Sequence, residues 1–116
     1  TMSQNPLHEI EMTIESAQAA IEEMQALERL RKNKDWQMLI ETGYLEKEGA
    51  RLVLARADPG LQDDNNQRQV DKMIDGVGYF RQYLNKIYQF GHHAERAIDD
   101  HRKTRDEIQQ EMMVNG

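Results

Sequence analysis

A seven-residue repeat of apolar side chains runs from Val70 almost to the C-terminus. With Val70 at position a, the a positions hold Val70, Val77, Leu84, Gly91, Ile98, Arg105 and Met112. The d positions hold Met73, Phe80, Ile87, Ala94, His101 and Ile108. Apolar residues at a and d form one narrow seam along a helix, and such a seam needs a partner helix. The repeat predicts a helix over about residues 66–113, which would be roughly 70 Å long at 1.5 Å per residue.

A second seam lies closer to the N-terminus. Its apolar residues alternate in steps of three and four along the chain: Leu7, Ile10, Ile14, Ala17, Ile21 and Met24. This spacing predicts another helix over about residues 7–32, with Pro6 tolerated in its first turn.

The segment between the two seams has a helical pattern over about residues 35–57. Asp35 is a candidate N-cap for this segment, and Gly43 is expected to interrupt it and divide it into two short helices. The run Asp58-Pro59-Gly60 is a strong stop and turn. Either Asp63 or Asp64 is expected to cap the long helix that follows.

These patterns predict an all-α chain, because the alternation typical of strands is absent. We expect one domain over residues 1–116, built as an elongated antiparallel hairpin or coiled coil. The first helix would cover the C-terminal half of the long helix, and the middle segment would cover its N-terminal half. Two-helix sections bury little apolar surface, so we expect a homo-oligomer. The predicted contact residues are Val70, Met73, Val77, Phe80, Leu84, Ile87, Ile98 and Ile108 of the long helix, with Ile14 and Ile21 of the first.

Aromatic side chains are concentrated in one stretch of the long helix. Phe80 falls on the seam, whereas Tyr79, Tyr83 and Phe90 fall towards a second face. We expect this stretch to be the main oligomer contact, because aromatic residues are enriched at interfaces. The alternative is that residues 36–54 simply cover it.

Composition narrows the function. Acidic residues (21) outnumber Lys and Arg (15), so the formal net charge is −6, which disfavours nucleic acid as a partner. The chain has no cysteine and therefore no disulfide or thiolate site. No apolar run reaches the roughly 20 residues of a membrane span, so we expect no membrane partner.

The sequence offers no catalytic, metal or cofactor constellation, and we expect no enzyme activity. His92 and His93 are adjacent, which points their side chains about 100° apart on a helix. The nearest approach to a metal site is His92 with Glu95 and Asp99, a trio that usually forms a solvated polar stripe. His101 on the seam could set the helix register and make assembly pH-sensitive.

Basic residues cluster at 29–34 and at 102–105. Together with a helix-turn-helix interpretation of residues 36–42 and 44–56, they leave nucleic-acid binding open as the minority interpretation. Helix capping and pairing along a helix explain these residues adequately.

Several short stretches between residues 27 and 98 resemble a group of small helical proteins of tailed bacteriophages. These stretches are Leu27-Glu28-Arg29-Leu30, Asn33-Lys34-Asp35-Trp36, Gly43-Tyr44-Leu45, Glu48, Arg51-Leu52-Val53, Asp58-Pro59, Leu61-Gln62, Ile74-Asp75, Gly78 and Arg81-Gln82-Tyr83-Leu84. Such proteins are often encoded near head genes. The resemblance implies a role around virion assembly, in the host cytoplasm or in the virion, with another phage protein as partner.

The leading hypothesis is a self-associating structural, scaffold-like or chaperone-like protein of virion morphogenesis. An alternative is an inhibitor of a host enzyme or defence system, because an acidic helical surface can block a basic groove.

Overall fold

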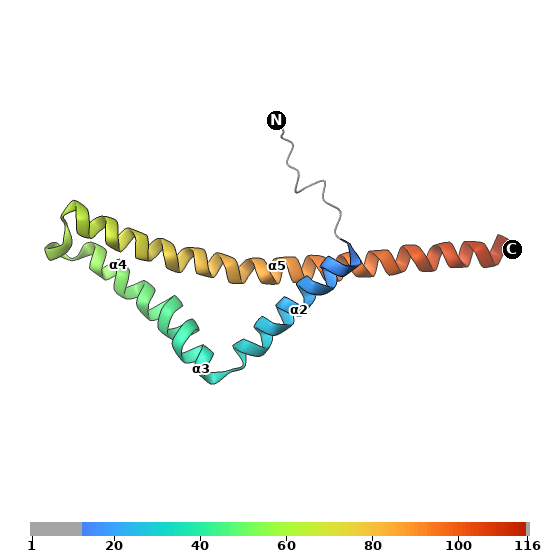
Figure 1. Cartoon of the computed structure of the whole chain (residues 1–116), viewed down its shortest axis with the longest axis horizontal. Helices are drawn as coiled ribbons and strands as arrows, with labels where there is room; N and C mark the ends of the chain where they lie inside the picture. The colour runs from blue at the N-terminus through green and yellow to red at the C-terminus, as the bar shows by residue number, and fades with distance from the viewer. Residues whose placement is uncertain (1–12, 116) are drawn as a thin grey trace, which may run out of the picture. The chain divides into compact units, whose positions relative to one another are not determined.

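The computed structural model describes residues 13–115, and its regular elements are all helical (Figure 1). In chain order they are α2 (Ile14–Arg31), α3 (Lys34–Trp36), the π-helix η1 (Gln37–Glu48), α4 (Gly49–Ala57), the short 3₁₀ helix η2 (Pro59–Leu61) and α5 (Asp64–Asn115). The prediction of an all-α fold is confirmed for these residues. The predicted helix start near residue 7, with Leu7 and Ile10, lies outside the described residues.

The chain divides into two compact units, where the sequence pattern predicted one domain. The central unit is Ala26–Lys86, and the terminal unit combines Thr1–Gln25 with Ile87–Gly116. The helix α5 pairs with a different segment in each unit. Each unit is described by itself below.

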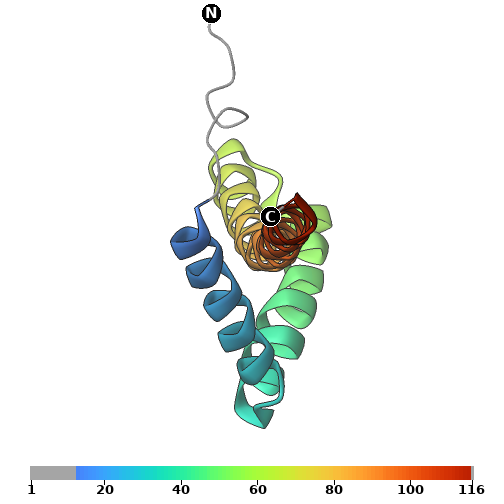
Figure 2. The ribbon, with the colours of Figure 1, turned by 90° about the vertical axis from the view of Figure 1, so that its right-hand side faces the viewer.

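A single continuous helix carries the long heptad seam. α5 extends over 52 residues (Figures 1 and 2). The side chain of Asp63 caps its start, because Asp63 Oδ2 accepts from the backbone N–H of Asn66 at 3.1 Å. Gly76, Gly78 and Gly91 all lie within this helix and do not interrupt it.

Residues 34–57 of the central unit form consecutive helical elements, so the predicted break at Gly43 is wrong. The chain passes through this position in the wide turns of η1. A Cβ placed on Gly43 would lie 2.8 Å from the carbonyl oxygen of Met38. Glycine therefore permits the close approach to the Met38 carbonyl in this π-helical turn instead of ending the helix.

The cap of this helical segment also differs from the prediction. Asn33, and not Asp35, is the N-cap: its backbone is extended, and its Oδ1 accepts from the N–H of Trp36 at 3.0 Å. Asp35 lies inside the first turn, where its negative charge interacts favourably with the helix dipole.

In the central unit, η1 and α4 run antiparallel to the first part of α5. Residue numbers fall from Arg56 to Tyr44 along one side while they rise from Asp71 to Phe80 along the other. Arg56 pairs with Asp71 at 3.1 Å, and the rings of Tyr44 and Phe80 meet edge to face at 5.9 Å. The middle segment therefore covers the N-terminal half of the long helix, as predicted.

In the terminal unit, α2 runs antiparallel to α5. Met24 lies against Gly91, and Ile14 lines a shallow groove with His101 further along α5. Ala17, Met24 and Ala94 are buried here. The small residues Ala17, Gly91 and Ala94 let the two helices approach closely.

Candidate interaction surfaces

The predicted contact residues of the central unit fall into two groups. Val70, Val77 and Leu84 are at most 8% exposed, and η1 and α4 pack on this part of α5. Phe80 is half-buried beside Tyr44, and Met73 is 45% exposed. The chain itself therefore covers these three a positions of the central unit, and a partner cannot contact them while this packing lasts.

The predicted contact residues of the terminal unit are less covered. Ile21, Ile87 and Ile98 are half-buried, whereas Ile14 and Ile108 are exposed. The surface that remains available for a partner is therefore different from the continuous seam inferred from the sequence.

The outer face of α4 is an exposed apolar surface that the sequence analysis missed. Leu52 points into the central unit and is 1% exposed, whereas its neighbours Val53 and Leu54 are 61% and 72% exposed. Ala50 and Ala57 are also exposed and share the helical spacing of Val53 and Leu54. The signal was present in the sequence, since three consecutive apolar residues cannot all point to one side of a helix.

Two tyrosines of α5 form a second exposed surface in the central unit. Tyr79 and Tyr83 are spaced by one helical turn, and both are more than half exposed. The middle segment therefore does not cover these two tyrosines, although its Tyr44 packs on the neighbouring Phe80. In the terminal unit, Phe90 is likewise 56% exposed.

A network of polar contacts fixes the corner between α2 and α3. Arg31 Nε pairs with Glu41 Oε2 at 2.9 Å, and Trp36 Nε1 donates to the same carboxylate at 3.2 Å. Gln37 Nε2 donates to the carbonyl oxygen of Arg31. These contacts tie the end of α2 to η1, so the corner is a defined surface.

Three charged side chains, Glu48, Arg51 and Asp63, have pKa values shifted by local hydrogen bonds. A bidentate hydrogen bond from Arg51 lowers the pKa of Glu48, and the same contact raises the pKa of Arg51. Hydrogen bonds from the side chain and backbone of Asn66 lower the pKa of Asp63. Glu48 and Arg51 form an i,i+3 pair across the junction of η1 and α4, and Asp63 caps the start of α5.

The histidines of α5, His92, His93 and His101, lie on exposed surface. His92 Nδ1 is 3.1 Å from Glu95 Oε1, and the His92 ring stacks on Tyr88 with a centroid distance of 6.4 Å. His101 is exposed and lines a shallow groove with Ile14 and Ile98. Within residues 13–115, no three His, Cys, Asp or Glu side chains are placed to hold a metal ion.

The helix-turn-helix interpretation is wrong in its geometry, because residues 36–57 contain no turn at Gly43.

Among the described helices, none combines the length and apolar composition of a membrane span. No protein-family model, curated protein or solved structure matches the chain.

Proposed function

We propose that the chain is a non-enzymatic, self-associating helical protein that acts in virion assembly of a tailed phage. Its role would be structural, scaffold-like or chaperone-like, in the host cytoplasm or as part of the virion. The phage assignment follows from the sequence resemblance across residues 27–98. The self-association follows from the exposed surface described above.

One observation carries the proposal of self-association. Among the described residues, fourteen large hydrophobic side chains are exposed, whereas nine hydrophobic residues are buried. Scattered exposed apolar residues are normal, but several of these are grouped on helix faces, such as Val53 with Leu54. Pairing between copies removes such faces from water, at roughly 25 cal/mol per Å² of apolar surface.

The first test is the mass of the chain in solution. Light scattering at several protein concentrations should give a mass above the 13.6 kDa of one chain, and the mass should rise with concentration. A constant mass of one chain over the whole concentration range would contradict the proposal.

The second test addresses virion assembly. A tagged chain expressed in phage-infected cells should co-purify with phage head or tail proteins, and it should sediment with assembly intermediates. Recovery of host enzymes alone would contradict a role in assembly and would favour the alternative, an acidic inhibitor of a host protein. Binding to such a basic host protein should weaken steeply with salt.

A further inference from the structure

We infer that copies of this chain associate head to tail, with the acidic end of α5 of one copy bound to the basic corner of the next. This inference rests on the proposed self-association and names two surfaces that contribute to it. The basic corner consists of Arg29, Leu30, Lys32, Lys34, Met38 and Leu39 of the central unit. The acidic tail consists of Glu107, Ile108, Glu111, Met112 and Val114 of the terminal unit.

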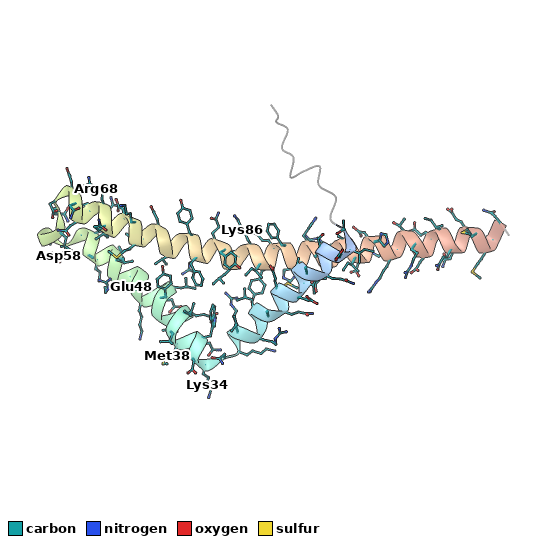
Figure 3. The ribbon with its side chains drawn as sticks, viewed as in Figure 1. Lys34, Met38, Glu48, Asp58, Arg68 and Lys86 are labelled. Carbon is teal, nitrogen blue, oxygen red and sulfur yellow. The ribbon has the colours of Figure 1, made fainter. Side chains whose placement is uncertain are left out.

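The basic corner combines positive charge with exposed apolar surface. Residues 28–35 contain four basic residues and two acidic ones, and Arg29, Lys32 and Lys34 are exposed. Leu30 is 46% exposed, and Met38 and Leu39 are more than half exposed. Lys34 and Met38 are one turn apart and lie at the same end of the α3–η1–α4 segment (Figure 3).

The corner is held in shape from within. The ion pair between Arg31 and Glu41, with the hydrogen bond from Trp36, fixes the turn that presents the cations. The cap from Asn33 orders the first turn of the next helix. A partner would therefore meet a preformed surface and would not need to order it, which lowers the cost of binding.

The acidic tail is the chemical complement of this corner. Residues 106–115 contain three acidic residues and no basic one. Ile108 and Met112 are one turn apart on α5 and are 52% and 68% exposed, and Glu107 and Glu111 lie beside them with the same spacing. The tail therefore presents an acidic edge next to an apolar stripe, as the corner presents cations next to apolar side chains.

The two surfaces complement each other in both charge and hydrophobicity. Two tails in parallel would bring Glu107 and Glu111 of both copies together, and two corners would bring their cations together, which is unfavourable. Association of tail with corner is therefore heterologous: each copy uses both surfaces, and the assembly grows as a closed ring or an open chain.

Matched charge reversals test this contact. The corner variant Lys32→Glu/Lys34→Glu has an acidic corner and an acidic tail, and the tail variant Glu107→Lys/Glu111→Lys has a basic corner and a basic tail. Each variant alone should have a lower mass by sedimentation velocity than the unaltered chain at the same concentration. An equimolar mixture should regain the larger mass, because each reversed surface then meets its opposite.

The control variant Lys72→Glu/Lys86→Glu makes the same charge change at exposed residues of α5 outside both surfaces. It should keep the mass of the unaltered chain. The far-ultraviolet circular dichroism of every variant should show unchanged helix content. The mass of the unaltered chain should fall as salt is raised, because exposed charges are screened over about 10 Å at 0.1 M salt.

The outcomes separate this inference from the proposed function. If either variant alone keeps the larger mass, or the mixture does not regain it, the head-to-tail contact is overturned while self-association stands. If the unaltered chain has the mass of one copy at all concentrations, both are overturned.

Discussion

Gly91 of α5 lies so close to Met24 of α2 that no other residue fits at position 91 without movement of the helices. A Cβ placed on Gly91 would be 2.5 Å from Met24 Sδ and 2.6 Å from Met24 Cβ. The Sδ atom could move aside, but Cβ is fixed to the backbone. The close approach of these two helices therefore depends on the missing side chain of Gly91.

Gly91→Ala should lower the free energy of unfolding by about 1–3 kcal/mol, because the added methyl overpacks the contact. It should also lower stability in a Met24→Ala background, since the Cβ of residue 24 remains. Urea unfolding followed by circular dichroism measures both values.

Gly78→Ala is the matched control in the same helix. Nothing lies within 4 Å of a Cβ placed on Gly78. The substitution should raise stability by up to about 1 kcal/mol, because alanine is the better helix former. Equal changes in stability for the two substitutions would show that helix propensity alone determines the effect of Gly91→Ala.

Gly43→Ala should destabilise the central unit, although alanine normally favours a helix. The new Cβ would lie 2.8 Å from the backbone carbonyl of Met38, and a backbone atom cannot rotate away. A lower melting temperature than that of the unaltered chain is expected. An increase would mean that residues 37–48 adopt an ordinary α-helix in solution.

Asn33→Ala should cost about 1 kcal/mol, because it removes the oxygen that accepts from the Trp36 N–H. Asn33→Asp keeps an acceptor at this position and should retain most of the stability. Thermal unfolding of the two variants separates the contribution of the capping hydrogen bond from that of the substitution itself. Similar losses in both would indicate that the cap contributes nothing.

Asp63 should give the chain a pH-dependent stability. Its pKa in the folded chain lies below its ordinary value of 3.8, so its charged form stabilises the fold. This contribution is present above about pH 3.8 and is lost as the pH falls through the lower folded pKa. The difference in melting temperature between the unaltered chain and Asp63→Ala should therefore be largest near pH 7 and should narrow in acid. A difference that stays constant down to pH 2 contradicts a role for the charge.

Substitution by alanine should lower stability far more at Leu52 than at Leu54. Leu52→Ala should cost about 2–5 kcal/mol, because it empties a buried position. Leu54→Ala should change the stability of the dilute chain by less than about 0.5 kcal/mol, because the side chain is exposed. In concentrated solution, however, Leu54→Ala should lower the mass by light scattering. An unchanged mass would remove the α4 face from the association surface.

The sequence was informative where one helix has one apolar face. The heptad positions Val70, Val77 and Leu84 are buried, as an internal helix pairing requires. The sequence was less informative in the middle segment, since hydrophobic periodicity assumes 3.6 residues per turn and η1 departs from it. The exposed face of Val53 and Leu54 was missed because the pattern there was interpreted as one covering stripe.

The amino-acid sequence by itself determined that the chain is helical, that it turns at Asp58-Pro59-Gly60 and which residues of α5 share a helix face, because these depend on spacing and local chemistry. Only the tertiary structure decided that α4 covers Val77 and leaves Leu54 in water, and that Met24 meets Gly91. The reason is physical: periodicity fixes the direction of a side chain from its own helix axis, whereas burial depends on which other helix lies in that direction.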